Sequence, residues 1–585
     1  MIMQRIENKF LSKYISMPTL LAVITILFFS LFSCDEEEFL KEEPLDFLTP
    51  SNSYVTNEDF EAAIYDLHST VRNDLWGQGG RDDNPRVTWY GTDLALTYFD
   101  TTGSNDYRAR WGAQGVQLDL WRILYRLIYD SNVVISRSKA ENKLTTEQRL
   151  VFEAEARFFR GFAYNKLANL WGGVPLVLEE TTEPKKDYVR ATREATYQQA
   201  ADDLEFAADN LPDIDTTSES RINKLAASHV LTEVYLSLNQ WQDAITESSK
   251  VINHPNTALM TERFGSRVGE SPNSEFPWGS GDNKDVYWDL FRQGNQDRSA
   301  GNKESIWNLQ YQYQIDGGGD GQYLLERFVG PFITRASVRE SNGSTKTVVL
   351  LPSTYYMGRS QGFIRPSDYF LNELWEKSGF DQDIRNAPHN IVRDIKVNNP
   401  TSEHHGKYIM ADNVPLVRTT NNDTMRFFYP MVMKVSTPEN HPSEFWDADQ
   451  TIPGTLLGSA QQTWRKHYMI RLADTYLLRA EAYLGNGDLI NAAGDINTVR
   501  RRSHAPDVLP ADVDIDYIMD EQLRELHFEK LRIFTLGRLG KIVDRNRQFN
   551  PIVGEYIGDH QNLWAIHFSE ILKNTEAKLE QNPGY

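Results

Sequence analysis

A ring-rich segment, residues 76–111, holds the side chains whose chemistry is easiest to name. Seven of its 36 residues are aromatic, a share of 19% against 12% for the whole chain. Five glycines interrupt the segment, which is typical of loops rather than of a helix. Rings in surface loops can stack on the apolar faces of sugars, and we expect about two of the seven to do so while others fill space beneath the loops. The candidate ligand-binding rings are Trp76, Trp89, Tyr90, Tyr98, Tyr107 and Trp111.

Arginines are interleaved with these rings, and Arg81 and Arg108 are candidate ligand contacts. A guanidinium group binds a carboxylate or sulfate through two parallel hydrogen bonds, so this mixture would suit an anionic polysaccharide. The five aspartates of the segment outnumber its four arginines, however. Local ion pairing is therefore the competing interpretation.

A second group of rings lies at Trp278, Tyr287 and Trp288, among further glycines. These three residues are also candidate ligand contacts, for the same reason. Trp307 differs from them because it sits in an apolar stretch, which favours a place in the protein core.

Catalytic and metal-binding patterns are not evident in the sequence. It contains no H-E-x-x-H, G-x-S-x-G or G-x-x-x-x-G-K-[ST] motif. The abundant carboxylates leave a glycosidase pair possible, but acidic chains contain many such pairs by chance. The net charge of −21 argues against a nucleic-acid ligand, which needs clustered Lys and Arg. We therefore expect no enzymatic activity, no cofactor and no metal site.

The N-terminus has the pattern of an exported protein. Basic residues precede an apolar run over residues 20–32, which is too short for a membrane-spanning helix of roughly 20 residues and fits a signal peptide. Cys34 follows directly and is the only cysteine of the chain. We expect Cys34 to be the lipid-attachment site of a lipoprotein, anchored durably by several acyl chains. The acidic run at residues 35–38 would keep the following tether solvated.

Helical periodicity dominates the regions that flank a long central stretch. Apolar spacing predicts helices over residues 145–171, 191–211, 223–238 and 241–252. Further along the chain it predicts helices over residues 467–484, 489–502 and 516–538. In two of the predicted helical hairpins a tyrosine is followed nine residues later by an alanine: Tyr235 by Ala244, and Tyr483 by Ala492. This spacing is that of tetratricopeptide repeats, where the ring packs against the small residue of the partner helix.

Between the two helical regions the periodicity is mostly lost. Residues 256–464 are rich in Gly, Asn, Asp and Pro, with short β-rich pieces near residues 347–351 and 429–435. A stretch of this length is too long for a structureless loop, so it should pack on the helices. The sequence thus predicts a mainly α fold, a tetratricopeptide-like helical superhelix with a long, irregular, loop-rich insertion that carries short β pieces.

Several motifs resemble those of the SusD/RagB family of Bacteroidetes surface lipoproteins, and they occur in the order of that family over nearly the whole mature chain. They begin with FLKEEPLD at residues 39–46. AEARFFR at residues 154–160 and LWGGVPLV at residues 170–177 follow, and the second of these is the most specific block. IRLADTYLLRAEA at residues 470–482 and INTVR at residues 496–500 resemble the C-terminal signature. We expect the charged residues of these motifs, namely Arg157, Arg160, Glu481 and Arg500, to form ion pairs rather than ligand contacts.

The resemblance implies a function and a set of partners. Proteins of this family bind oligosaccharides or, less often, peptides, and sit as a lid over a SusC-like TonB-dependent transporter in the outer membrane, facing the exterior. Two alternatives stay open: an all-helical polysaccharide-degrading enzyme, and a peptide-uptake or scaffold lipoprotein without a sugar site. The expected organisation is a signal peptide at 1–33, a lipidated tether at 34–48, an N-terminal helical part at 49–255, and a C-terminal part at 256–585 that contains the insertion at 256–464 and helical repeats at 465–545, all packed as one globular unit.

Overall fold

The computed structural model describes residues 53–77, 88–97, 106–141, 143–270, 273–278, 284–322, 325–449 and 451–585. The expected signal peptide and the whole expected tether, including Cys34, lie outside the described residues, as do Tyr98 and Arg81. Residues 56–585 pack against one another as one unit. In the described part of the chain, no helix combines the length and the apolar character needed to cross a membrane.

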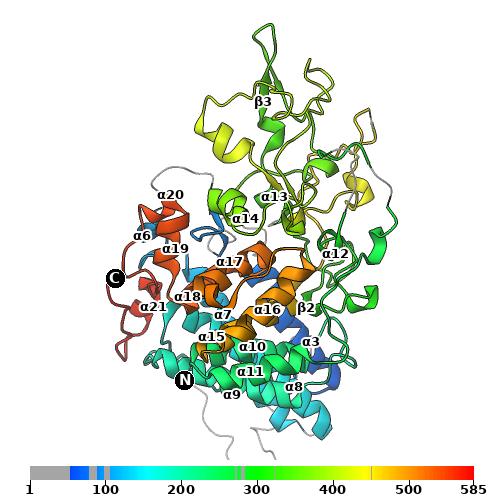
Figure 1. The fold of residues 1–585 in the computed structure, drawn as a ribbon. Helices are drawn as coiled ribbons and strands as arrows, with labels where there is room; N and C mark the ends of the chain where they lie inside the picture. Colours follow the sequence, from blue (N-terminus) through cyan, green and yellow to red (C-terminus); the bar gives the residue numbers. More distant parts are fainter. Residues whose placement is uncertain are drawn as a thin grey trace, which may run out of the picture. The chain divides into compact units, whose positions relative to one another are not determined.

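Seven helices stack side by side in two runs that lie far apart in the sequence. In the first run each helix packs against the next, from α7 to α11, and α11 then packs against α15 of the second run. Figure 1 shows α10 and α11 beside α15 and α16. The two runs of helices therefore form one continuous layer of paired helices. The helices are α7 (Leu118–Ala140), α8 (Thr146–Trp171), α9 (Arg193–Asn210), α10 (Lys224–Ser237), α11 (Trp241–Ile252), α15 (Leu472–Gly485) and α16 (Leu489–Arg502).

Local sequence fixes where these helices begin. Thr145 and Gln148 form a reciprocal capping box at the start of α8, and Asn223 accepts hydrogen bonds from two backbone amides at the start of α10. Such side chains satisfy amide groups that have no partner within the helix. Gly172, with φ at +73°, ends α8. The predicted boundaries at 145–171 and 223–238 are therefore confirmed to within a residue or two.

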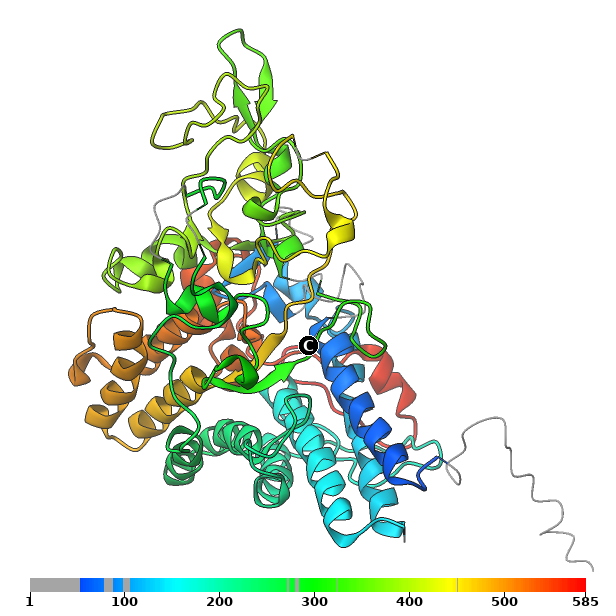
Figure 2. The same ribbon diagram turned by 90° about the vertical axis from the view of Figure 1, so that its right-hand side faces the viewer.

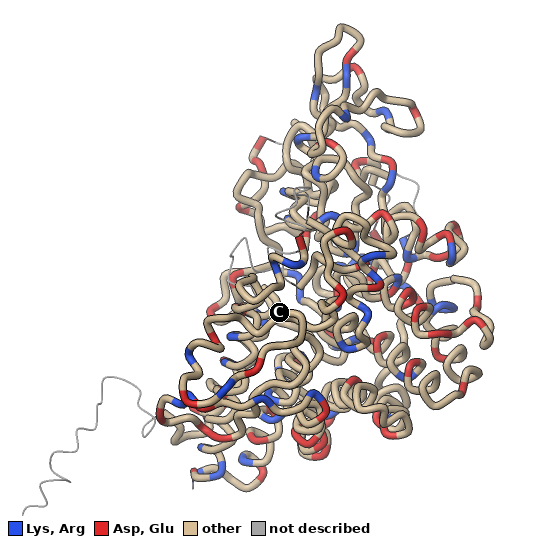
Figure 3. The backbone as a smooth tube through the Cα atoms, turned by 90° about the vertical axis from the view of Figure 1, so that its left-hand side faces the viewer, with Lys and Arg blue, Asp and Glu red and all other residues tan. Residues whose placement is uncertain are grey.

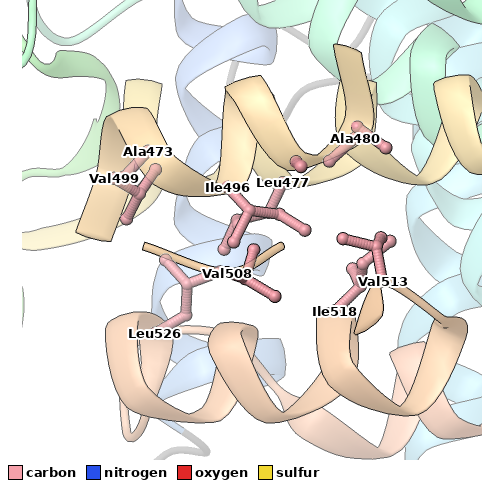
Figure 4. Packing of buried hydrophobic residues seen from close by; sticks show 11 residues of the cluster. Ala473, Leu477, Ala480, Ile496, Val499, Val508, Val513, Ile518 and Leu526 are labelled. Atoms are coloured by element: carbon pink, nitrogen blue, oxygen red, sulfur yellow. The ribbon is translucent and has the colours of Figure 1, made fainter. Parts of the chain in front are cut away.

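Small and aromatic residues meet where the helix pairs touch. Ala244 lies in one buried cluster with Tyr235 packed against it, and Ala492 lies in another with Tyr483 packed against it. Figure 4 shows α15 and α16 contributing to this second cluster above α17 (Ile515–Leu526). The tyrosine-to-alanine spacing therefore marks real helix contacts, and the tetratricopeptide-like, mainly α fold is confirmed.

Two predicted helices are corrected in part. Residues 467–471 form strand β8 (His467–Arg471), which pairs antiparallel with β2 (Ser305–Leu309), so the helix begins only at Leu472. The predicted helix over 516–538 is broken into α17 and α18 (Arg532–Arg538). A positive φ of 53° at Phe528 lies between them. The long helix α7 was not predicted.

The central stretch is built from short elements. Its strands pair antiparallel, two by two: β3 with β4, β6 with β7, and β5 with β1. Figure 2 shows most of this stretch, green to yellow, at the end of the unit away from α8 and α9. The strands are β1 (Ala95–Thr97), β3 (Ser337–Arg339), β4 (Thr345–Thr347), β5 (Ile364–Pro366), β6 (Ile391–Val392) and β7 (Met431–Val432).

Shorter helices occur both within and outside the central stretch. They include α3 (Asn57–Ser69), η1 (Thr70–Trp76), α6 (Tyr107–Arg110), α12 (Val286–Leu290), α13 (Glu326–Val329), α14 (Leu374–Glu376), α19 (Ile542–Phe549), α20 (Pro551–Gly554) and α21 (Phe568–Lys573).

A buried charge network joins the loop-rich stretch to the helices. Arg471 lies 2.7 Å from carboxylate oxygens of both Glu304 and Glu525, and all three side chains are fully buried. Arg385 of the loop-rich stretch also binds Glu525, at 3.1 Å. Buried charges are tolerated only when they are paired and hydrogen-bonded. These pairs therefore fix how the irregular stretch sits on α15 and α17.

The charged residues of the family-like motifs are also paired. Arg160 binds Asp203 at 2.6 Å and Glu481 binds Arg538. Arg157 binds Glu153 at 2.7 Å, and Arg500 binds Glu521 at 2.7 Å. The prediction that these residues form ion pairs is confirmed. Figure 3 shows acidic and basic residues interspersed along the described chain.

Candidate functional site

The described rings of the first ring-rich segment are buried. Trp76 and Trp89 are each 1% exposed, and Tyr90, Tyr107 and Trp111 are fully buried. Every residue from 88 to 97 is buried as well. The prediction of ligand contacts at these five rings is therefore corrected, because they are part of the core. The expectation that about two of the seven rings face a ligand stays a prediction, since Tyr98 and Phe99 lie outside the described residues.

Distant parts of the chain cover these rings. Trp76 stacks on His467 with ring centroids 3.6 Å apart, and Trp111 stacks on Tyr107 at 4.1 Å. Trp111 also packs against Trp564, near the C-terminus. Gly91 allows the backbone to pack closely against these rings. Gly91 has φ +77°, and a Cβ atom at this position would lie 2.9 Å from the Trp111 ring.

The charges of this segment divide between core and surface. Asp93 is fully buried between Arg532 and Arg545, each 2.8 Å away. Burial alone would raise the pKa of Asp93, but the two guanidinium charges lower it to about 2. Arg108, on α6, is exposed. Asp93 therefore forms ion pairs, as the competing interpretation of the charged residues predicted. Arg81 lies outside the described residues.

The second ring group keeps one ring at a cleft. Tyr287 and Trp288, on α12, are fully buried, so their predicted ligand contacts are also corrected. Trp307 is 2% exposed, and its predicted place in the core is confirmed. Trp278 is partly exposed and lines a cleft of about 840 Å³. This volume is in the range of pockets that bind small ligands.

Trp278 is held rigidly by other rings. It stacks on Phe276 with centroids 4.4 Å apart, and meets the edge of Trp288 at 5.5 Å. Trp288 in turn lies beneath the guanidinium group of Arg292, 3.8 Å from the ring centroid. The buried rings of this group thus form a support for the ring that lines the cleft.

Paired polar side chains surround Trp278. Arg263 binds Asp289 through two hydrogen bonds, and His389 lies 2.7 Å from Asp285. Lys284 is paired with Glu270. Partial burial opposes the charge of Arg263, but its hydrogen bonds to Asp289 raise its pKa above the ordinary value. The remaining lining residues are Thr261, Glu262, Val286, Ile384, Ala387, Pro388 and His504.

This arrangement is suited to binding rather than catalysis. A ring with one stacked face and polar groups around it matches a flat ligand that has an apolar face and many hydroxyl groups. Sequence reasoning found Trp278 but missed its polar neighbours. They come from residues 261–263, 284–289, 384–389 and 504, which only the tertiary fold brings together. No local pattern in the sequence marks them as one site.

Two models of known protein families match this chain. Residues 49–236 match a SusD-like family described as starch-binding and associating with the outer membrane, and residues 454–585 match the SusD family itself. The chain belongs to the SusD/RagB family. The first matched range ends within α10 and the second contains α15 and α16, while α11 and the loop-rich stretch with Trp278 lie between the two ranges.

Related proteins support this assignment over most of the chain. SusD-like protein P25 of Formosa agariphila is 24% identical over 555 residues, which cover 89% of this chain and 90% of the relative. A solved laminarin-binding SusD-like protein has the same fold, with a TM-score of 0.61, 20% identity and coverage of 90% and 99% of the two chains. Surface glycan-binding protein A from Bacteroides thetaiotaomicron, solved in complex with laminarihexaose, has a TM-score of 0.63, 17% identity and coverage of 90% and 99%.

Proposed function

We propose that this SusD-family protein captures oligosaccharides or polysaccharides at the cell surface, and that Trp278 is the central contact. The single observation that carries the proposal is the Trp278 cleft, in which a supported ring lies among paired polar side chains. Family membership supports the same class of ligand. Two neighbours of the same fold are described as binding laminarin or laminarihexaose.

The cleft favours a neutral glycan. A carboxylate or sulfate on the sugar would need a cation that is not already neutralised. Arg263 and Lys284 are instead paired with Asp289 and Glu270. An anionic glycan would therefore have to bind through residues such as Arg108, away from this cleft.

We infer the cellular setting from the N-terminal sequence and from the family. Lipid attachment at Cys34 would anchor the protein to the outer membrane, facing the exterior. From there it would deliver glycans to a SusC-like TonB-dependent transporter during polysaccharide degradation and uptake. The family description of association with the outer membrane supports this location. Incubation with radiolabelled palmitate, with Cys34→Ala as the control, tests the anchor: label on both proteins would contradict it.

We propose that the protein is not an enzyme. Arg263, Lys284 and His389 at the cleft are paired with carboxylates, and Trp278 supplies a binding surface rather than a nucleophile or an acid. An all-helical polysaccharide-degrading enzyme and a peptide-uptake lipoprotein are the alternatives. Release of oligosaccharides from a polysaccharide panel would favour the enzyme. Competition by peptides, with no loss of binding in the Trp278 variant, would favour the peptide protein.

Trp278→Ala is the decisive test of the cleft. Affinity should be measured by calorimetry or affinity gels with a panel of neutral glucans, including laminarihexaose, and with uronic and sulfated oligosaccharides. We expect about tenfold weaker binding of the best neutral ligand, since losing one ring contact costs on the order of 1.4 kcal/mol. Phe568→Ala, which removes an exposed ring on α21, is the matched control and should bind as the wild type does. Equal affinity of wild type and Trp278→Ala for every ligand would refute the proposed site.

A further inference from the structure

A second cleft lies between the α3–η1 helix and the chain from the end of β2 onward. Its volume is about 690 Å³, and it shares no lining residue with the Trp278 cleft. One wall is the helix face that carries Ala62, Tyr65, Ser69 and Arg72, spaced three or four residues apart. The other wall is formed by Asn308, Leu309, Gln310, Gln312 and the glycine-rich turn at Asp316, Gly317 and Gly318. Asp66, His68 and Ser220 complete the lining.

Arg72 connects the two walls of the cleft by hydrogen bonds. Its guanidinium group donates hydrogen bonds to the carbonyl oxygens of Gln310, at 3.1 Å, and Gly317, at 2.9 Å. Glycine at position 319 permits this close approach, because a Cβ atom there would lie 3.1 Å from Arg72 Nε. Its φ of +79° also favours glycine. The turn also closes on itself, since the Gln312 amide donates to the Gly318 carbonyl at 2.9 Å. The cleft is thus formed before any ligand arrives, which lowers the ordering cost of binding.

Tyr65 supplies a ring at the rim of this cleft. The residue is 46% exposed, which is unusual enough for a large aromatic side chain to suggest an interaction. The guanidinium group of Arg221 lies 5.7 Å from its centroid, and Arg221 is itself held by the buried Glu155 at 2.6 Å. The ring therefore has a fixed support, as Trp278 has in the first cleft.

The polar groups of the cleft select a neutral ligand. Gln312 and Asp316 are exposed, and their side chains make no hydrogen bond within the described part of the chain. Gln310 donates to the Glu219 carbonyl at 3.2 Å, which leaves its side-chain oxygen as an acceptor. The one arginine of the lining, Arg72, is bound to backbone carbonyls, and Asp66 is paired with Arg126 at 3.6 Å, while Asp316 contributes negative charge. Amides and carboxylates are suited to hydroxyl groups, and Asp316 would repel a sulfated or uronic sugar.

We propose that the Tyr65 cleft is a second binding site for a neutral saccharide, separate from the Trp278 cleft. The class of ligand rests on the proposed function, but the residues that form the site do not. Two sites on one rigid unit would let the protein hold a long polysaccharide at two points. The second contact would then form at a high effective concentration, and affinity for a polymer would exceed affinity for a short fragment.

The test uses the mature, full-length protein and four variants. Tyr65→Ala and Trp278→Ala each remove one ring, and the double variant removes both. Ile315→Ala is the control, because Ile315 is 58% exposed in the same turn but does not line the cleft. A glycan array with neutral and anionic oligosaccharides first identifies the best-bound neutral oligosaccharide, and calorimetry with that compound then gives affinity and stoichiometry.

We expect a stoichiometry of tight binding near two for the wild type and for Ile315→Ala, and near one for each single ring variant, in which the altered site binds about tenfold more weakly. The double variant should retain only this weaker binding. Wild-type stoichiometry near one, with binding weakened in Trp278→Ala and unchanged in Tyr65→Ala, would overturn the second site and leave the proposed function intact. Binding weakened in Tyr65→Ala but not in Trp278→Ala would support the second site and refute the first. An array on which the wild type retains no neutral glycan would overturn both.

Discussion

Residues 76–111 and residues 276–288 look alike as sequences, since both mix tryptophan and tyrosine with glycine. In the fold they differ. The described rings of the first segment are sealed in the core, whereas the second segment buries Trp288 and leaves Trp278 at a cleft. The difference lies in what covers each ring. His467, Phe528 and Trp564 close over the first segment, while Trp278 is covered on one face by Phe276.

The comparison shows that a glycine-rich, aromatic composition does not by itself indicate a surface. In the first segment, glycine lets rings approach the backbone closely, as at Gly91. In the second, a buried ring supports an exposed one. A ring is available to a ligand only when the fold brings no further layer over it, and that depends on residues far away in the sequence.

The largest effect should come from Trp111→Ala. The ring is fully buried, stacks on Tyr107 and contacts Trp564, so its removal leaves a cavity among rings that cannot fully close it. We expect a loss of about 3–5 kcal/mol in the free energy of unfolding. Chemical denaturation followed by tryptophan fluorescence and circular dichroism measures it.

Trp111→Ala should lower the stability of the protein without changing its affinity for glycans. At a temperature where the remaining folded fraction is high, Trp111→Ala should bind glycans with wild-type affinity, because the ring touches no cleft residue. Weaker binding by the folded variant, with stability unchanged, would mean that Trp111 reaches a ligand and that the two segments are alike after all.

The next effect should come from Asp93→Asn, which keeps the shape of the side chain but removes its charge. Arg532 and Arg545 would then lose the carboxylate that they share in the core. Breaking a buried pair in this way costs about 3 kcal/mol. The counterpart directly after the second segment is Asp289→Asn, whose partner Arg263 is 28% exposed and can be solvated. Thermal unfolding should therefore show a smaller loss for Asp289→Asn, and an equal loss would contradict the distinction between core and cleft.

A third effect should appear in the free energy of unfolding at acidic pH. The pKa of Asp93 is about 2 in the folded protein against 3.8 for the ordinary group, so its carboxylate stabilises the fold above pH 4. This contribution, about 2 kcal/mol, is lost as the pH falls from about 5 towards 2. The gap in stability between wild type and Asp93→Asn should shrink by that amount over this range. A gap that stays constant, as measured by urea unfolding at a series of pH values, would show that the pKa of Asp93 is not lowered.

Local patterns in the sequence were enough for much of the helical part. Apolar spacing and the Tyr-to-Ala spacing led to the right helices and the right fold class, and the structure adds the capping residues Thr145 and Asn223 at the starts of two of them. Helix α7 also carries a readable stripe, with Leu120, Leu124 and Ile128 buried at intervals of four residues. The local sequence therefore contains the signal for this helix.

Other features depend on contacts that no local pattern contains. Residues 467–471 have helical spacing, but they pair with β2 about 160 residues earlier, and the pairing makes them a strand. Trp111 is buried in part by Trp564, which is 453 residues away. In the candidate site the sequence indicated Trp278, but not Arg263, His389 or His504, because these residues meet only after the loop-rich stretch folds back on α16.

The smallest expected change in stability is also the one that best separates the two segments. Trp278→Ala removes a ring that is already partly in water and that packs on one face, so the free energy of unfolding should fall by about 1 kcal/mol or less. Trp288→Ala, in the same segment, removes a fully buried ring that lies under Arg292, and should cost about 3 kcal/mol. If denaturation gave equal losses for the two, Trp278 would be a structural ring like those of the first segment. A small loss for Trp278→Ala, combined with weaker glycan binding, is the result that only a ring at a binding cleft can give.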